Sequence, residues 1–405
     1  MVLNDTKLLK ILILLSSMEL YYYCFPFIPR ELFNAVFLII SLAFAFLLVY
    51  RSKFKKSGFF VWFVLSVWLL LSAINAYLGF GGLFWLGSWI KILFYITLSF
   101  YLYSQSKRVQ VVEIYSFLKK YLVFFVIVSL ILGVLLNNTQ LLNGRVRFQG
   151  LTYTSSIFSM YCGLGSIFYG WVLMIERKYT TLRCIKNLIF LLIFMFACYY
   201  SGSRQAFYGV LCSLIITVVW FSRFSVKLIM FSFMLVFISI FYQEIIRSFR
   251  FMLDIMFSQN ILASLSGLVD GSTLSRVRYF TYGLDYAQDN GMLLIGVGLN
   301  TFPSLYFSIT ATESPAAHNF ILMLIINYGL LGLVVFIISF LMFLMDNRKK
   351  PIIVLLLFYF LLGTSLNNPE YFCSFIVFYI VFLYIALCMP LVNNSKGKYE
   401  TFVRE

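Results

Sequence analysis

Long runs of apolar residues separated by short polar stretches alternate along the whole chain. A run of about 20 apolar residues is the length that an α-helix needs to cross a bilayer. The pattern therefore predicts an all-α polytopic membrane protein with twelve transmembrane helices. They are expected near residues 8–28, 32–50, 59–78, 83–103, 117–136, 156–175, 188–201, 205–221, 228–243, 318–343, 352–366 and 371–389.

The loops between these runs differ in charge from one side of the membrane to the other. Lysine and arginine cluster in RSKFKKSG, ERKYTTLRCIK, SRFSVK, DNRKK and the C-terminal tail, which all fall on one side. Cytoplasmic loops carry this excess of basic residues, so we expect both termini in the cytoplasm. The chain then forms one membrane domain, 1–405, with a large periplasmic loop at 244–317.

The opposite, outer side is expected to carry arginine but no lysine. Only the planar guanidinium group binds a phosphate or carboxylate in bidentate fashion, so this bias suggests an anionic ligand at the outer leaflet. Salt bridges to nearby aspartates are the alternative. The outer arginines are Arg30, Arg145, Arg147, Arg204, Arg247, Arg250, Arg276 and Arg278.

Two helices are expected within the large outer segment. Residues 248–265 have apolar positions at helical spacing and could lie in the membrane interface. A second helix follows the capping signal Ser272–Thr273 and ends near the turn Asn290–Gly291. On that helix Arg276 and Arg278 are about 200° apart, so at most one of them faces a given site.

Composition agrees with the membrane prediction and excludes several functions. The chain is 62% hydrophobic and 11% charged, unlike a soluble globular protein. Its net charge of +16 follows from the basic loops and does not indicate nucleic-acid binding. The seven cysteines lack metal or CxxC spacing, and no Walker A, HExxH or paired-carboxylate signature occurs. We therefore expect metal-free transfer chemistry with no cofactor.

The only histidine, His318, begins the tenth predicted span at its outer end. A histidine at a membrane surface is usually a hydrogen-bonded interfacial residue, but this one follows a loop with Glu313 and faces an arginine-rich surface. Neighbouring guanidinium charges favour a neutral imidazole, which can accept a proton at neutral pH. Arg204 in SGSRQAF, and Arg145 and Arg147 in NGRVRFQG, are either solvated loop residues or parts of an anion site.

These motifs, in chain order, resemble the O-antigen ligase and Wzy-type polysaccharide polymerase superfamily of integral membrane glycosyltransferases. RFQG (147–150) is similar to a first outer arginine motif of that family, and SGSRQAF (201–207) to its SGSR element. SRVRYF (275–280) with GVGLNTF (296–302), and AHNFILMLIINYGLLG (317–332), resemble its later motifs.

The resemblance implies transfer of a glycan from undecaprenyl diphosphate to a sugar hydroxyl. It implies that His318 is the general base or orients the acceptor, and that Arg204 and Arg276 bind the diphosphate. Arg147, Arg278 and Arg145 are further candidates for the diphosphate, with Asn319 and Glu313 in supporting positions. The expected partners are undecaprenyl-diphosphate-linked glycans as donor and acceptor, membrane lipid and, as a candidate, a protein that regulates chain length.

Three functions remain open at this stage. The first is a polymerase that extends a surface polysaccharide on a new lipid-linked repeat unit in the bacterial inner membrane. The second is an O-antigen ligase that transfers the chain to lipid A-core. The third is a flippase or transporter of lipid-linked glycans, which the lack of internal repeats and the outer location of the polar residues disfavour.

Overall fold

A computed structural model describes the chain at residues 5–16, 56–81, 84–104, 110–142, 145–152, 154–175, 181–202, 204–221, 271–310, 320–364 and 373–388, and at scattered helical positions between 36 and 50. The predicted span at 228–243 and the predicted interfacial helix at 248–265 lie outside the described residues.

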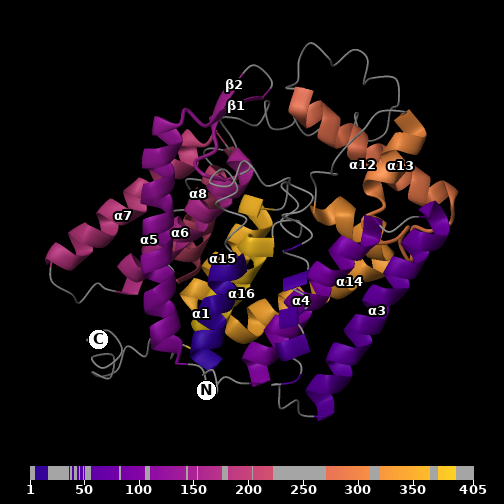
Figure 1. The fold of residues 1–405 in the computed structure, drawn as a ribbon, viewed down its shortest axis with the longest axis horizontal. Helices are drawn as coiled ribbons and strands as arrows, with labels where there is room; N and C mark the ends of the chain where they lie inside the picture. The colour runs from indigo at the N-terminus through magenta and orange to yellow at the C-terminus, as the bar shows by residue number, and fades with distance from the viewer. Residues whose placement is uncertain are drawn as a thin grey trace.

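The described part of the chain is a helical bundle with one small β-hairpin (Figure 1). Its elements are α1 (Asp5–Ser16), α3 (Lys56–Phe80), α4 (Phe84–Ser104), α5 (Val111–Leu135), β1 (Thr139–Leu142), β2 (Arg145–Phe148), α6 (Ser155–Ile175), α7 (Thr181–Tyr200), α8 (Arg204–Phe221), α12 (Gly271–Asp289), α13 (Phe302–Thr310), α14 (Phe320–Asn347), α15 (Pro351–Tyr359), the π-helical turn η2 (Phe360–Thr364) and α16 (Cys373–Cys388).

The predicted spans coincide with helices wherever the structure describes them fully. Five helices, α3, α4, α5, α6 and α14, are long and apolar enough to cross a bilayer, and shorter apolar helices lie within α7, α8, α15 with η2, and α16. The fifth span begins earlier than expected, because the amphipathic residues 111–116 continue α5. The chain is thus an α-helical multi-pass membrane protein, whereas the number twelve stays a prediction.

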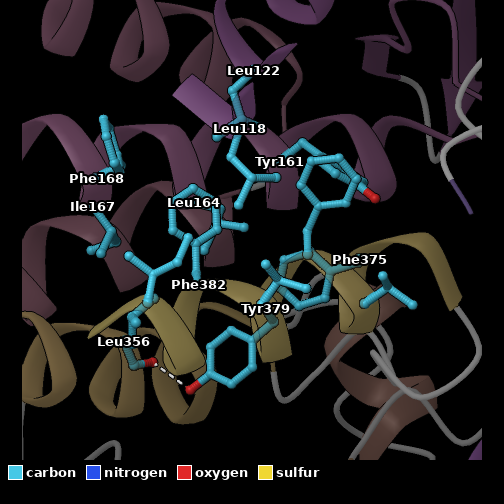
Figure 2. Packing of buried hydrophobic residues seen from close by; sticks show 14 of the residues in the cluster. Leu118, Leu122, Tyr161, Leu164, Ile167, Phe168, Leu356, Phe375, Tyr379 and Phe382 are labelled. Atoms are coloured by element: carbon cyan, nitrogen blue, oxygen red, sulfur yellow. Dashed lines mark hydrogen bonds between the residues drawn. The ribbon is translucent and has the colours of Figure 1, made fainter. Parts of the chain in front are cut away.

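The centre of the bundle is α6, which is buried along almost its whole length. Figure 2 shows α6 side chains such as Tyr161 and Phe168 packed between α5 on one side and α15 and α16 on the other. The hydroxyl of Tyr379 on α16 donates a 3.1 Å hydrogen bond to the carbonyl of Leu356 on α15. In a bilayer, close packing of this kind replaces the hydrophobic effect as the force that associates helices.

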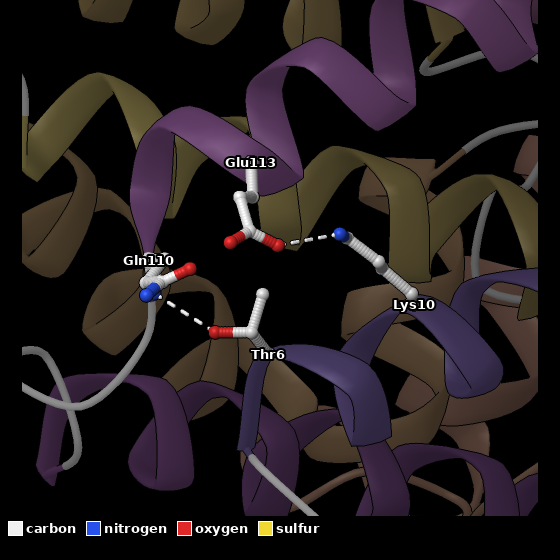
Figure 3. A network of polar contacts seen from close by, with 4 residues as sticks. All are labelled: Thr6, Lys10, Gln110 and Glu113. Carbon is white, nitrogen blue, oxygen red and sulfur yellow. Dashed lines mark hydrogen bonds and ion pairs between the residues drawn. The ribbon is translucent and has the colours of Figure 1, made fainter.

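Polar contacts between α1 and α5 define one end of the bundle. Lys10 on α1 forms a 2.7 Å ion pair with Glu113, and the backbone N–H of Gln110 donates to the hydroxyl of Thr6 (Figure 3). The start of α1 therefore lies beside the start of α5. The β-hairpin follows the other end of α5, and we call that end of the bundle the hairpin end.

Within the described part of the chain, the hairpin departs from the all-α prediction, which treated residues 137–155 as a loop. Strands β1 and β2 pair antiparallel, with Gln140 opposite Arg147 and Leu142 opposite Arg145. The dipeptide Asn143–Gly144 separates them in the sequence. Asn-Gly between two alternating segments is a strong hairpin signal, so this element could have been predicted from the sequence.

Candidate functional site

The hairpin is tied closely to the helices on either side of it. The side-chain amide of Asn138 donates a 2.7 Å hydrogen bond to the carbonyl of Gly150, and the backbone N–H of Asn138 donates to Gly133 at the end of α5. Phe148 is 3% exposed and packs on Phe158 of α6 with a centroid distance of 5.4 Å. The hairpin therefore holds Arg147 in a fixed place at the end of the bundle.

Arg147 lies against the turn that joins α7 to α8. Gly202 in this turn has a left-handed φ of +73°, and a methyl group on its Cα would lie 3.1 Å from Cγ of Arg147. Tyr200, the last residue of α7, packs on Phe148 with a centroid distance of 5.0 Å. The fold thus brings together two arginine motifs, RFQG and SGSR, that are far apart in the sequence.

The guanidinium group of Arg147 has unused hydrogen-bonding capacity. Its Nε is buried and has no hydrogen-bond partner among the described residues. No acidic residue occurs in the sequence at 137–155 or 199–206, so these segments bring positive charge without a local counter-ion. A buried donor without a partner is costly, and an anion that accepts from it would remove that cost.

Helix α8 begins at Arg204, and its position is fixed by close packing of α8 against η2. A methyl group on Gly209 would lie 2.2 Å from Cα of Gly363 in η2, so only glycine allows the two backbones to come so near. The side chain of Gln205 donates a 3.4 Å hydrogen bond to the carbonyl of Leu362. The backbone of Arg204 is therefore fixed at the hairpin end, next to the turn that Arg147 covers.

Helix α14 is broken at one residue, Gly329, and the break creates a binding surface for another segment of the chain. At Gly329 the backbone has φ 70° and ψ −175°, a conformation that is essentially restricted to glycine. In an unbroken helix the N–H groups of Leu330 and Leu331 would donate to Ile326 and Asn327. Here they donate instead to the carbonyls of Leu293 and Leu294, at 2.9 and 3.2 Å.

The carbonyls that the break sets free find new donors. Val297 and Gly298 donate their N–H groups to Ile326, at 2.7 and 3.1 Å. The hydroxyl of Ser72 on α3 donates a 2.6 Å hydrogen bond to the carbonyl of Asn327. The carbonyls of Ile326 and Asn327 thus regain donors, which is what irregular backbone inside a membrane protein requires.

The residues 292–300 are thus anchored between α3 and α14, and we call them the docked segment. Asn300 donates its N–H to the side-chain carbonyl of Asn327, at 3.2 Å, and Leu299 donates to Ser72. A methyl group on Gly298 would lie 2.4 Å from the backbone nitrogen of Ala76. The glycines of GVGLNTF therefore serve close backbone packing.

Helices α12 and α13 cover the first part of α14 (Figure 1). They share a small core with it, formed by residues that include Phe302, Leu305 and Leu322. The prediction of a helix that ends near Asn290–Gly291 is confirmed, since α12 ends at Asp289. The backbones of Arg276 and Arg278 lie in the first part of α12, one turn apart or less.

The sequence-predicted site residues are therefore described to different extents. Arg147 is placed with its side chain, whereas Arg145, Arg204, Arg276 and Arg278 are placed by their backbone. His318, Asn319 and Glu313 lie outside the described residues. By chain order His318 precedes the first residue of α14, Phe320, by two positions.

Sequence reasoning missed the residues that hold the docked segment. Asn327 is 5% exposed and accepts hydrogen bonds with both its side chain and its backbone carbonyl. An asparagine inside an otherwise apolar span was the signal that could have revealed it, because a polar side chain at membrane depth requires a partner. Among the residues that the structure describes, no three His, Cys, Asp or Glu side chains are placed to hold a metal ion.

These observations define a class of protein: a multi-pass helical membrane protein with arginines at one end of the bundle. A family model described as O-antigen ligase matches residues 188–337, so the chain is similar to the O-antigen ligase/Wzy-type superfamily over this part of its length. Members of this family are membrane glycosyltransferase-like enzymes that act on lipid-linked glycans. The match runs from α7 into α14 and so includes the turn at Gly202, α12 and the docked segment. A comparison with curated proteins found no match.

Proposed function

We propose that the protein is a polysaccharide polymerase. It transfers the growing glycan from undecaprenyl diphosphate to the terminal sugar of a new undecaprenyl-diphosphate-linked repeat unit, at the periplasmic face of the bacterial inner membrane. The observation that supports this most directly is the position of Arg147. Its buried, unpartnered Nε lies beside the turn that leads to Arg204, where neither segment supplies an acidic residue.

The proposed reaction is a displacement at the anomeric carbon of the donor glycan. The acceptor hydroxyl oxygen forms the new glycosidic bond, the bond to the diphosphate breaks, and the diphosphate leaves with the electron pair. His318 accepts the proton of the acceptor hydroxyl as general base. Negative charge grows on the diphosphate as it leaves, so preorganised guanidinium groups stabilise the transition state more than the ground state.

We assign the diphosphate to Arg147, Arg204 and Arg276, with Arg145 and Arg278 as further candidates. Asn319 and Glu313 flank the base in the sequence and are assigned supporting roles. Described lysines such as Lys10 and Lys350 lie toward the opposite end of the bundle, which supports a periplasmic hairpin end and cytoplasmic termini. A protein that regulates chain length is a candidate partner within this proposal.

An O-antigen ligase is the second candidate, because the matching family model carries that description. A ligase would use the same donor and the same arginines but would transfer the glycan to lipid A-core. The two functions differ only in the acceptor, so the acceptor decides between them.

Purified protein in proteoliposomes separates the candidates. A polymerase converts lipid-linked repeat units alone into a ladder of longer chains that remain on the lipid diphosphate. A ligase forms product only when lipid A-core is added. A flippase forms no covalent product in either reaction, and that result would refute the proposal.

Deletion of the gene gives an independent test in the cell. Loss of a polymerase leaves core capped with a single repeat unit, and loss of a ligase leaves long chains on undecaprenyl diphosphate. Accumulation of lipid-linked units in the cytoplasmic leaflet would indicate a flippase.

The role of Arg147 is tested by Arg147→Ala. Loss of one charge-assisted hydrogen bond worth about 1.5–3 kcal/mol lowers kcat/KM by roughly 10- to 100-fold. Arg348→Ala is the matched control, because it removes an exposed arginine from the turn between α14 and α15, at the other end of the bundle. Equal kcat/KM values for the two variants would contradict the assignment.

A further inference from the structure

Asn327 on α14 joins three segments of the fold through its two carbonyl oxygens. The side-chain carbonyl accepts a 3.2 Å hydrogen bond from the backbone N–H of Asn300 in the docked segment. The backbone carbonyl accepts a 2.6 Å hydrogen bond from the hydroxyl of Ser72 on α3. Asn327 is 5% exposed, and hydrogen bonds are stronger in such a buried, low-dielectric environment than in water.

The docked segment connects the two helices that pack on the first part of α14. Helix α12 ends at Asp289, just before the segment, and α13 begins at Phe302, just after it. Figure 1 shows α12 and α13 beside α14. The hydrogen bond between Asn300 and Asn327 therefore fixes the point on α14 from which the chain turns into α13.

The apolar contacts between α12 and α14 do not determine their register by themselves. A methyl group on Gly283 of α12 would lie 3.1 Å from Cδ1 of Leu322 and 3.3 Å from Cδ1 of Ile326. Both atoms are the flexible ends of side chains, and apolar packing has no preferred direction. A hydrogen bond is directional, so the one to Asn327 sets the register that the apolar contacts leave undetermined.

This register matters because two of the proposed reacting groups belong to these two helices. Arg276 precedes Gly283 by seven residues on α12, which is about 10 Å along the helix. Phe320, the first residue of α14, follows His318 by two positions and precedes Asn327 by seven. A shift of α12 along α14 would therefore move Arg276 relative to the start of α14.

We propose that Asn327 is a positioning residue for the transfer reaction. By holding the docked segment in one register, it fixes the distance between the arginine of α12 and the base at the start of α14. The inference rests on the proposed function, because that function assigns Arg276 and His318 to one reaction. Asn327 acts through these residues and does not contact the substrate.

The kinetic constants distinguish positioning from substrate binding. Arg147 and Arg204 lie on β2 and α8 and continue to bind the diphosphate when α12 shifts. The KM of the donor should therefore change by no more than about twofold. The chemical step needs aligned reacting groups, and a misplacement of about 1 Å costs about 10²-fold, so kcat should fall by roughly 10- to 100-fold.

Three variants at this position test the role of the acceptor oxygen. Asn327→Leu keeps the approximate size of the side chain and removes the acceptor for Asn300. Asn327→Asp keeps an oxygen acceptor in either protonation state and should restore kcat to near the wild-type value. Asn327→Ser is a milder second variant, whose shorter side chain does not reach Asn300, and it should lower kcat as Asn327→Leu does.

The matched control is Asn187→Leu, which also removes a buried asparagine from a membrane helix. Asn187 is 4% exposed and lies on α7, across the bundle from the docked segment (Figure 1). The assay is glycan extension from lipid-linked repeat units in proteoliposomes, with kcat and the donor KM measured for each variant. The control is expected to keep the wild-type kcat.

Four kinetic results would overturn the inference alone. They are a wild-type kcat in Asn327→Leu, an equal loss in Asn327→Asp, an equal loss in the control, and a raised KM at unchanged kcat. A wild-type protein that forms no glycosidic bond would instead overturn the proposed function, and the positioning role with it.

Hydrogen–deuterium exchange at the amide of Asn300 tests the hydrogen bond without any reaction. Exchange should accelerate roughly tenfold or more in Asn327→Leu and Asn327→Ser, because the amide loses its acceptor, and should stay near the wild-type rate in Asn327→Asp. An unchanged exchange rate in Asn327→Leu would overturn the inference even if kcat fell.

Discussion

The break in α14 offers the sharpest test of the fold, because a single methyl group should release the docked segment. In Gly329→Ala the new Cβ would lie 2.1 Å from the carbonyl oxygen of Leu294 and 2.6 Å from the backbone nitrogen of Gly296. Both neighbours are backbone atoms and cannot turn away as a side chain could. The docked segment must therefore move.

The expected cost has two parts. A non-glycine residue in this backbone conformation costs about 1–3 kcal/mol. Moving the segment also breaks the hydrogen bonds that Leu330 and Leu331 donate to Leu293 and Leu294, at about 1 kcal/mol each or more where the groups stay buried. Together, the backbone strain and the lost hydrogen bonds destabilise the docked segment by about 3–5 kcal/mol.

The assay is hydrogen–deuterium exchange of the purified protein, read at the amides of Val297 and Gly298. Because each 1.4 kcal/mol changes a local opening equilibrium tenfold, the exchange of these amides should accelerate by roughly 10²- to 4 × 10³-fold in Gly329→Ala. Gly291→Ala is the matched control. Gly291 has a similar φ of +65°, but a methyl group there meets nothing within 4 Å.

Gly291→Ala introduces a similar backbone strain but no clash with the docked segment, so it separates the two effects. We expect it to raise the amide exchange of Val297 and Gly298 only slightly. If amide exchange accelerated equally in the two variants, the hydrogen bonds of Leu330 and Leu331 to Leu293 and Leu294 would not be what anchors the docked segment.

Three further predictions concern the candidate site. Arg204→Lys should lower kcat/KM by roughly 10-fold or more, since an ammonium group cannot form the bidentate contact; wild-type activity in reconstituted protein would remove that argument. His318→Ala should be expressed and inserted but form no long chains, a loss of about 10²–10⁴-fold in rate, and normal chain lengths on gels would count against a base at this position. Gly202→Ala should displace Arg147, since φ is +73° and Cγ of Arg147 lies 3.1 Å from the added methyl group, and should raise KM. Gly81→Ala, with a φ of +68° and open space around it, is the control, and an equal KM in both would contradict the contact.

The sequence predicts the helices of this fold well because length and hydropathy decide them. The run from residue 156 to 175 becomes α6 with almost the same bounds, and the Asn290–Gly291 turn after α12 follows from its residue types. The hairpin was missed because the alternation around Asn143–Gly144 is short and lies beside much longer apolar runs. The Asn-Gly turn signal was present in the sequence, but the long apolar runs on both sides dominated the interpretation.

Other features could not be derived from local patterns. The packing of Arg147 on Gly202 joins segments that are distant in the chain, and a single sequence holds no signal for such a pair. The run from Phe320 to Asn347 predicts an unbroken span, because hydropathy does not show that residues 293–298 supply replacement hydrogen bonds. The glycines of the docked segment and of α14 indicate close packing, but the sequence does not show which segment packs against them.

The contact between Gly209 and Gly363 has a consequence for biosynthesis. Helix α8 leaves the ribosome long before η2, so during translation the start of α8 lacks the surface against which it finally rests. The hairpin end of the bundle, with its proposed diphosphate site, is therefore completed only after η2 has been synthesised. A chain that stops before η2 would therefore carry the arginines of the proposed site without the helix packing that positions Arg204.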